Sequence, residues 1–440
     1  MSIRQNLRLY RLCSVATAAC LLCSTHAWAD DRVLNLASVM AAAQQNFSVS
    51  FTRQAAEAAK ADVLTADRAP FPVLTMKTSQ MYLDGGVAGG GDVGPGPFAQ
   101  KNIDKSGGID WTWERGGKRS YRTQSATRSA NAAQADLQEA LIGQQTAAAA
   151  AYFDLLAAQE RNQEMQQLSQ SALLLAKTAG LRLKAGDLSA QEAARLEIEA
   201  NRALAEGHAA ELDQQRALLQ LGQLTNLRID LKQWRVQADW PSISARALPA
   251  TTDEAWIAQR SDVVAAQERV AAAEASAQLA NAQKSADVTL GTSLDHDPRV
   301  SRRMLELRLS LPLQWGYGHE GEIGRAQAQL TQAQDQLEKT KLDAQADTQR
   351  LLQELRTAKQ RASLYEQEIT PRAKRVAQQA ELAYTKGASS LTDLLDARRT
   401  LRSTLIESAL ARADHAKAYT AWQLRTQTHP SANSQITYAQ

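Results

Sequence analysis

The sequence predicts a mainly α-helical protein with a small β part. Small and apolar residues recur at alternating spacings of four and three over long stretches, which is the seam pattern of a coiled coil. Only four short segments show the alternation that is typical of a strand. The chain also repeats its own plan, which predicts two long helical hairpins and two β-hairpins, one of each kind per half.

Residues 1–29 have the features of a secretory signal peptide. A short apolar run follows three arginines, Arg4, Arg8 and Arg11. Ala27-Trp28-Ala29 is an A-x-A cleavage site, so we expect the mature chain to begin near Asp30. Cys20 and Cys23 raise the alternative of a lipid anchor, but the residues before them favour simple cleavage.

The composition of the expected mature chain excludes several classes of protein. All three cysteines lie inside the signal segment, which excludes disulfides and cysteine-based metal sites after cleavage. Subtracting the three signal arginines from 50 Lys and Arg leaves 47, against 47 Asp and Glu, so there is no basic excess that would indicate nucleic acid binding. No later stretch approaches the roughly 18 apolar residues of a transmembrane helix, so strands would have to make any membrane crossing.

The two halves align in two places: 58–76 with 272–290, and 182–196 with 384–397. Each half is expected to contain a first helix, two strands, a very long helix and a return helix. The first half places them at about 37–69, 73–82, 103–113, 120–184 and 189–224. The second half places them at about 252–285, 287–295, 304–313, 320–386 and 390–427, with Pro371 expected to kink the long helix. The first repeat therefore covers 30–225 and the second 252–427, separated by a linker at 226–251 and followed by a tail at 428–440.

Glycines dominate residues 84–98, which we expect to form a surface loop. On the long helices a second apolar stripe lies beside the first, so these helices can pack on both sides, as in a cylindrical wall. An ordinary coiled-coil rod explains the helices equally well.

The predicted strands favour the cylindrical wall of helices over the coiled-coil rod. In the fourth strand one face holds leucines and the other holds Glu306, Arg308 and Ser310. A soluble sandwich would alternate in the same way. However, the protein is expected to be exported, and three aromatic residues, Trp113, Trp315 and Tyr317, cluster where strands meet helices, as in an interfacial girdle.

Four strands cannot close a barrel, and open strand edges are not viable in lipid. The sequence therefore predicts that copies share one barrel, with twelve strands in a trimer. Glu306, Arg308 and Ser310 would then face a water-filled lumen. The residues expected to face lipid are Leu305, Leu307, Leu309, Leu311, Trp111 and Trp113.

Together with these features, two stretches resemble the TolC family of outer membrane factors: "AGDLSAQEAARLEIEANRA" (185–203) and "GASSLTDLLDARRTL" (387–401). The resemblance covers about 35–427. It implies a trimer with a twelve-stranded transmembrane β-barrel, continued by a periplasmic α-barrel with an equatorial belt that includes the linker. It also implies a passive exit duct of a tripartite efflux system, in the outer membrane with a large periplasmic part. The implied partners are a periplasmic adaptor protein and an inner membrane transporter of the RND type.

The resemblance also implies roles for particular residues. Asp393 and Asp396 match positions that form acidic rings at the periplasmic constriction; the alternative is an ordinary acidic pair near a helix N-terminus. The turns after the long helices would be adaptor-docking tips, or simple helix caps. The tip residues are Gly186, Asp187, Leu188, Ser189, Gly387, Ser389 and Ser390.

"WTWERGGKRSYR" (111–122) and "AYFDLLAAQERN" (151–162) resemble most the heavy-metal branch, of the cobalt–zinc–cadmium type, so heavy-metal cations are the expected cargo. Drug efflux and type I protein secretion are alternatives for the same duct. We expect no cofactor and no resident metal, because the histidines are scattered without a pair at ligand spacing.

We find no nucleotide-binding loop or catalytic constellation, so we do not expect an enzyme. A periplasmic coiled-coil scaffold is the main rival. An adaptor protein is a second rival, but it would have one long hairpin and more strands than this chain offers.

Overall fold

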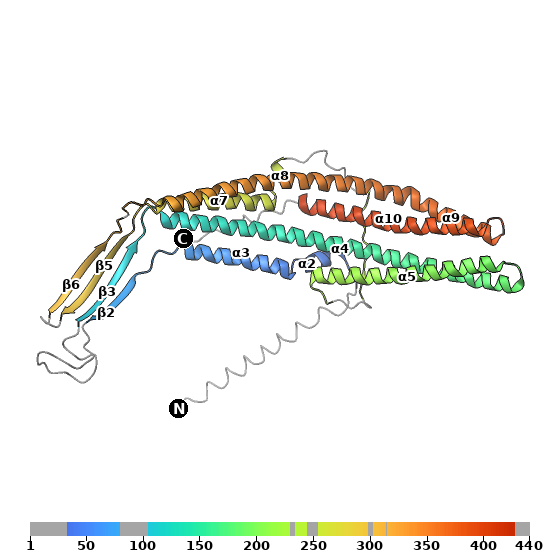
Figure 1. Ribbon diagram of the computed structural model, residues 1–440, viewed down its shortest axis with the longest axis horizontal. Helices are drawn as coiled ribbons and strands as arrows, with labels where there is room; N and C mark the ends of the chain where they lie inside the picture. Colours follow the sequence, from blue (N-terminus) through green and yellow to red (C-terminus); the bar gives the residue numbers. More distant parts are fainter. Residues whose placement is uncertain are drawn as a thin grey trace, which may run out of the picture. The chain divides into compact units, whose positions relative to one another are not determined.

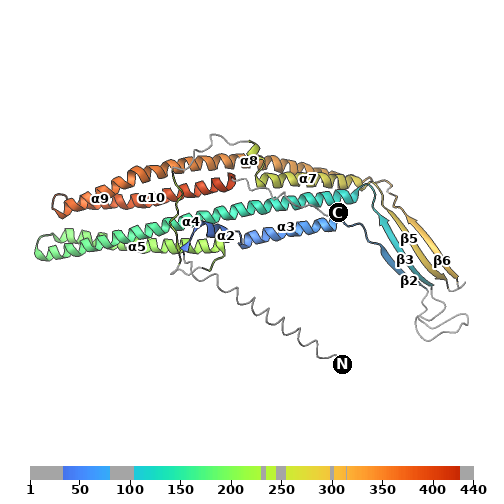
Figure 2. The same cartoon turned by 180° about the vertical axis from the view of Figure 1, so that it is seen from behind.

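The computed structural model describes residues 33–79, 104–228, 234–243, 254–297, 302–313 and 315–426. These residues form long helices and one four-stranded antiparallel sheet, which Figures 1 and 2 show from opposite sides. The mainly helical fold class with a small sheet is therefore confirmed. None of the described helices has the length and apolar character needed to cross a membrane. The signal segment, the loop at 84–98, most of the linker and the tail lie outside the described residues.

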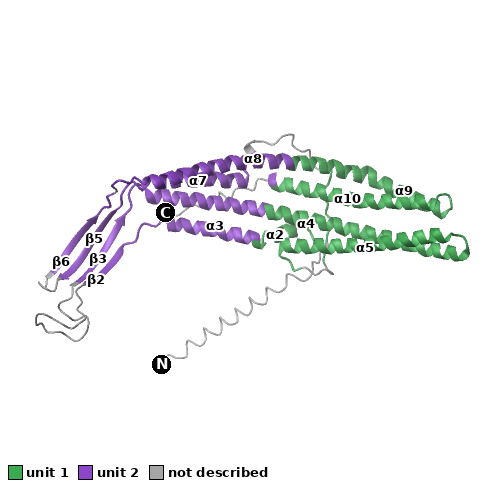
Figure 3. Cartoon of the chain, viewed as in Figure 1, with its two compact units in different colours: residues 1–47, 143–248, 351–424 green, residues 48–142, 249–350, 425–440 purple. Residues whose placement is uncertain are grey.

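The chain divides into two compact units, which are coloured separately in Figure 3. Each unit takes segments from both halves of the sequence. Unit 1 comprises Met1–Phe47, Gly143–Leu248 and Leu351–Leu424. Unit 2 comprises Ser48–Ile142, Pro249–Arg350 and Arg425–Gln440.

Unit 2 contains the sheet, with strand order β2-β3-β5-β6. The strands are β2 (Val73–Ser79), β3 (Asp104–Trp113), β5 (Val288–Asp297) and β6 (Arg302–Ser310). The two predicted hairpins are joined into one sheet because β3 pairs with β5. Strand β6 ends before the predicted limit because Pro312 cannot donate a hydrogen bond to a ladder. Residues 80–82 and Ile103, also predicted as strand, lie outside the described residues.

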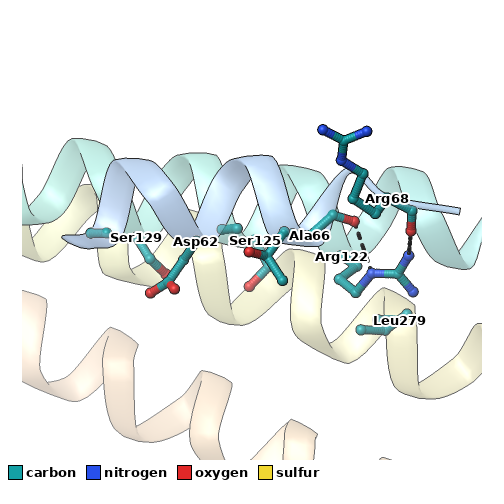
Figure 4. Close-up of a pocket in the computed structure, with 10 residues that line it drawn as sticks. Asp62, Ala66, Arg68, Arg122, Ser125, Ser129 and Leu279 are labelled. Carbon is teal, nitrogen blue, oxygen red and sulfur yellow. Dashed lines mark hydrogen bonds between the residues drawn. The ribbon is translucent and has the colours of Figure 1, made fainter. Parts of the chain in front are cut away.

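The helical part of unit 2 consists of the first stretches of α4 (Lys118–Ala185) and α8 (Glu320–Leu364), together with α3 (Phe47–Ala66), α7 (Ser261–Ala282) and the short α6 (Glu254–Ile257). Arg122 of α4 donates to the carbonyl oxygens of Ala66 and Arg68, both at 2.9 Å (Figure 4). The same guanidinium pairs with Glu114 at 2.7 Å. Arg122 thus fixes the end of α3 beside the point where β3 leads into α4.

A buried arginine ties the start of α7 to α8. The Arg260 side chain is only 4% exposed and bonds Asp262 at 2.8 Å, Asp347 at 3.2 Å and Thr348 at 3.1 Å. Arg350 also donates to Asp347, at 2.7 Å. The pKa of Asp347 lies below its usual value: although burial opposes this shift, hydrogen bonds from Arg350 and the charge of Arg260 stabilise the carboxylate.

Unit 1 contains α2 (Leu36–Ala43), α5 (Ala190–Thr225), α9 (Thr370–Thr385), α10 (Leu391–Thr426) and the second part of α4. A short parallel pair that the sequence did not predict, β1 (Val33–Leu34) with β4 (Arg235–Val236), brings the described part of the linker to the core. Trp240 stacks on Phe153 with ring centroids 6.0 Å apart, and the Tyr152 hydroxyl donates to the Gln237 carbonyl at 2.7 Å. The largest buried side chains of this core are Val39, Tyr152, Phe153, Leu155, Leu156 and Leu221.

The first predicted helix is interrupted, because the chain leaves helical geometry between α2 and α3. There Asn46 donates to the carbonyl oxygens of Gln223 at 3.2 Å and Leu224 at 3.0 Å. These carbonyls lie at the end of α5, where helix geometry leaves acceptors unsatisfied. The single helix predicted over 37–69 is therefore wrong, since the side chain of Asn46 is used to complete another helix.

The long helix of the second half changes its winding near Pro371, where the sequence predicted a kink. A π-helical turn, η1 (Tyr365–Ile369), separates α8 from α9. The backbone N–H of Thr370 donates to the carbonyl of Tyr365, five residues earlier. Because proline lacks an N–H and its ring collides with the carbonyl four residues before it, a wider turn accommodates it.

Candidate functional site

The predicted site residues lie in two places, the sheet of unit 2 and the two helical turns of unit 1. The sheet is two-faced. Trp111, Leu290 and Leu309 are directly opposed across β3, β5 and β6, and so lie on one face. Asp110, Gly291 and Arg308 form the next row, on the other face. The register thus separates the residues predicted to face lipid from those predicted to face a lumen.

The apolar face is largely open in the single chain. Leu307 is 80% exposed and Trp113 is 71% exposed. Exposed apolar patches on this scale mark surfaces that contact other molecules or lipid. Leu305 and Leu309 lie on the same face, Leu311 is exposed just beyond the end of β6, and Trp315 and Tyr317 are exposed before α8 begins.

An ion pair crosses three strands on the polar face. Arg308 of β6 donates to Asp110 of β3 at 2.8 Å, passing over Gly291 of β5. A Cβ at Gly291 would lie 2.3 Å from Oδ1 of Asp110, so a side chain there is incompatible with this arrangement. Thr75 of β2 donates to Asp110 at 3.3 Å, and Glu306 lies 4.0 Å from the Arg308 guanidinium. The residues predicted to face the lumen were Glu306, Arg308 and Ser310. Alternation also placed Asp110 and Gly291 on the polar faces of their strands, but the sequence did not predict that Arg308 would reach Asp110 across Gly291.

The two helical turns are built alike. Gly186 and Gly387 adopt φ values of +84° and +74°, in the left-handed region that favours glycine. In the first turn the N–H of Asp187 donates to the Arg182 carbonyl at 2.9 Å, and in the second the N–H of Ala388 donates to the Ala383 carbonyl at 2.8 Å. Ser189 then caps α5 in a capping box with Glu192.

At the start of α10, Asp393 has the role that Glu192 has at the start of α5. Its carboxylate accepts hydrogen bonds from the N–H of Ser390 at 3.1 Å and from the hydroxyl of Ser389 at 3.3 Å. Hydrogen bonds from Ser390 hold the pKa of Asp393 below its ordinary value. Asp396, one turn later, is exposed and lies 3.7 Å from Arg399. Within one chain, Asp393 therefore acts as a cap, and its role at a constriction remains a prediction.

The tip residues differ in exposure. Gly186, Asp187, Ser189, Gly387 and Ser390 are exposed. Leu188 and Ser389 are half-buried, and Leu188 packs against a cluster that joins the two turns. That cluster consists of Ala179, Leu196, Tyr384, Leu391 and Leu394. The two turns therefore form one surface of unit 1, on which the docking role remains a prediction.

Two arginines that the sequence prediction missed link the hairpins of unit 1. Arg398 of α10 donates to the hydroxyl of Ser171 on α4 at 2.8 Å and pairs with Glu381 of α9 at 3.2 Å. Arg402, one turn further, pairs with Glu206 of α5 at 3.0 Å and with the buried Glu199 at 3.5 Å. Their four-residue spacing, which places both on one helix face, was the only signal available in the sequence.

Among the described residues, no group of three or more His, Asp or Glu side chains is arranged to hold a metal ion. His415 of α10 is buried beside Tyr419, with ring centroids 6.2 Å apart. Burial, reinforced by the positive charge of Lys359, holds the pKa of His415 below its ordinary value.

Residues 254–426 match the sequence model of a family described as "Outer membrane efflux protein". This part of the chain therefore belongs to the outer membrane efflux protein family. The match covers β5 and β6, the second long helix and the second tip, so it includes Glu306, Arg308, Asp393 and Asp396.

One protein is similar to this chain in sequence, and solved structures of outer membrane channels share its fold. The chain is 24% identical to the cobalt-zinc-cadmium resistance protein CzcC of Cupriavidus metallidurans over 292 residues, which are 66% of this chain and 68% of that protein. The CmeC outer membrane channel of Campylobacter jejuni superposes with a TM-score of 0.76 at 15% identity, covering 92% of this chain and 90% of that one. The MtrE outer membrane channel of Neisseria gonorrhoeae superposes with a TM-score of 0.71 at 18% identity, covering 89% of this chain and 88% of that one.

Proposed function

We propose that this efflux family protein is a passive exit duct in the outer membrane, formed by three copies of the chain. The observation that carries the proposal is the four-stranded sheet, which has one exposed apolar face and one polar face. Its edge strands are β2 and β6, and no other described strand pairs with their outer edges. Open edges and an exposed apolar face are both costly in water. Pooling the sheets of three copies gives twelve strands, pairs every edge and turns the leucines toward lipid.

The two-repeat plan completes this proposal. Residues 30–225 and 252–427 would each contribute one β-hairpin to the barrel and one long helical hairpin to a periplasmic α-barrel. The linker at 226–251 and the tail at 428–440 would form an equatorial belt. The contacts of Trp240 with Phe153 and of Tyr152 with the Gln237 carbonyl support the placement of the linker against the helices.

The helical tips would dock a periplasmic adaptor protein, which would connect the duct to an inner membrane transporter of the RND type. Asp393 and Asp396 would line the periplasmic constriction, where three copies bring six carboxylates together and favour cations. The duct itself would catalyse no reaction. The cargo we propose is heavy-metal cations, supported by the likeness to CzcC, whose name is that of a cobalt-zinc-cadmium resistance protein.

Cell fractionation tests the duct. We expect the full-length protein in the outer membrane fraction, extracted only with detergent, and running as a trimer on an unheated gel and as a monomer after boiling. In planar bilayers it should conduct ions. A monomer released from the periplasm without detergent would instead indicate the coiled-coil scaffold.

The same bilayers test the two acids. Replacing Asp393 and Asp396 together by asparagine should lower cation selectivity or alter conductance, while retaining a side chain that can cap α10. The matched control is Glu192→Gln, which changes the equivalent cap of α5. If the double variant conducts like the unmodified protein, capping is the whole role of these carboxylates.

A further inference from the structure

The buried face of the second long helix shifts by one residue at the π-helical turn η1. Two sets of three buried residues, each spaced by four and then seven positions, lie on either side of this turn: Leu351, Leu355 and Ala362 before it, and Ala373, Ala377 and Tyr384 beyond it. Leu351 and Ala373 are 22 positions apart, one more than three heptads, so the seam contains one extra residue. Because its hydrogen bond spans five residues where an α-helix spans four, η1 absorbs this extra residue.

The first hairpin keeps a single phase over the corresponding stretch. Its long helix α4 is an uninterrupted α-helix over Lys118–Ala185. Buried residues that are separated by whole heptads run along it: Ala151, Met165, Ala172 and Ala179. The two hairpins share one plan, but this wider turn belongs to the second, and π-helical turns are frequent at functional sites.

The segment around η1 is less well satisfied than a regular helix. The hydroxyl of Thr370 is buried and has no hydrogen-bond partner among the described residues. Pro371 follows it and has no N–H to donate. Because an unpaired buried hydroxyl is unfavourable, this segment is locally less stable than the helix on either side, as expected of a segment that changes conformation.

The contacts on the two sides of the turn differ. At its start, the Tyr365 hydroxyl donates to Glu407 of α10, and the Arg361 guanidinium lies 5.9 Å from the centre of the Tyr365 ring. Beyond it, Lys374 of α9 pairs with Glu164 of α4 at 3.5 Å, and both side chains are partly exposed. Exposed ion pairs contribute little to stability. The start of the turn is therefore anchored to α10, whereas this ion pair holds α9 only weakly.

We propose that η1 is a hinge at which α9, with the tip that carries Asp393 and Asp396, bends relative to Leu351–Leu364 of α8. The inference rests on the proposed duct, because only there would the two acids line a constriction. The first hairpin would keep its tip in place, and α10 would follow by curving gently along its length, as long helices do. The apolar cluster that joins the two tips would keep the bent position a minor state.

Distances between spin labels on different copies test the hinge. Asp187→Cys and Ala388→Cys each place one label at equivalent positions, directly after the glycines of the two turns. The expected mature chain has no other cysteine. In the assembled full-length protein, the distance distribution for the label at Ala388→Cys should be about twice as wide as that at Asp187→Cys, because the hinge moves one tip and not the other.

The hinge itself can be removed. Deleting Gln367 from a chain with Pro371→Ala takes out the extra residue and the proline together, which should leave continuous heptads along the helix. The distribution at Ala388→Cys should then narrow to that at Asp187→Cys. The matched control is Gln367→Ala with Pro371→Ala, which changes the same two positions but keeps the extra residue, and its distribution should stay wide. Both variants should still assemble, as measured on unheated gels.

Equal widths at the two tips of the unmodified protein, or a width that the deletion leaves unchanged, would overturn the hinge. A deletion variant that does not assemble, while the control does, would also contradict it, because the extra residue would then be needed for packing. If the labelled unmodified protein shows no distances between copies, the duct itself is disproved. Distances between copies with equal widths at both tips would disprove the hinge alone.

Discussion

At the residue scale, His415 couples the stability of unit 1 to pH. It is 3% exposed on α10, lies within the electrostatic influence of Lys359 and packs beside the ring of Tyr419. Its pKa in the folded protein lies below the ordinary value of 6.5, so the unfolded chain binds the proton first. The neutral imidazole of His415 therefore makes its full contribution to the stability of the native state above about pH 6.5. This contribution is lost as the pH falls below that value toward the lowered pKa.

We expect His415→Gln to make unfolding less dependent on pH between 7.5 and 5.5. At pH 7.5 the variant should be less stable by about 1 kcal/mol, a typical cost for a point substitution. Tryptophan fluorescence during guanidinium unfolding in detergent would measure both effects. His208→Gln, at an exposed position of α5, is the control and should leave the pH dependence unchanged. If the free energy of unfolding changed with pH equally in the unmodified protein and in His415→Gln, this histidine would not titrate with unfolding.

At the scale of elements, the sheet depends on a glycine beneath the Asp110–Arg308 pair. Because a Cβ at Gly291 would lie 2.3 Å from the Asp110 carboxylate and 3.1 Å from the Arg308 guanidinium, Gly291→Val should separate this pair. We expect the sheet to lose about 1–3 kcal/mol of stability, the usual cost of overpacking. The assembled protein should then dissociate after incubation at a lower temperature, as measured by gel electrophoresis. Gly107→Ala is the control, since nothing lies within 4 Å of a Cβ there. Equal effects of the two substitutions would contradict a specific role for the ion pair.

The same sheet shows which features of an element can be predicted from sequence. Alternation is local, so the strands and the two faces of β6 could be predicted from residues 304–313 alone. The pairing of Trp113 with Val288 joins the two halves of the chain, and no local pattern encodes it. Helix caps follow the same rule. Ser189 and Glu192 are visible as a capping box in the sequence, whereas the break between α2 and α3 depends on contacts of Asn46 with the distant carbonyls of α5.

At the scale of the whole molecule, the proposed duct would have to open, and the structure indicates what holds unit 1 together. Arg398 and Arg402 connect α10 of the second hairpin to α4 and α5 of the first. Glu199 is only 8% exposed, so its pairing with Arg402 is poorly screened by salt. If opening separates the hairpins near their tips, these contacts must break first, and weakening them should populate the open state.

We therefore expect Arg398→Gln with Arg402→Gln to raise the mean single-channel conductance in planar bilayers severalfold, corresponding to about 1–2 kcal/mol in favour of opening. The control, Arg372→Gln, removes an exposed arginine that pairs with Glu368 within its own stretch of helix, and its conductance should stay unchanged. The arginine substitutions should change how often the channel opens, because these arginines would join the walls of the opening. The asparagine substitutions at Asp393 and Asp396 should instead change ion selectivity, because those acids would line the opening. A double arginine variant that conducts like the control would show that the hairpins separate elsewhere, or not at all.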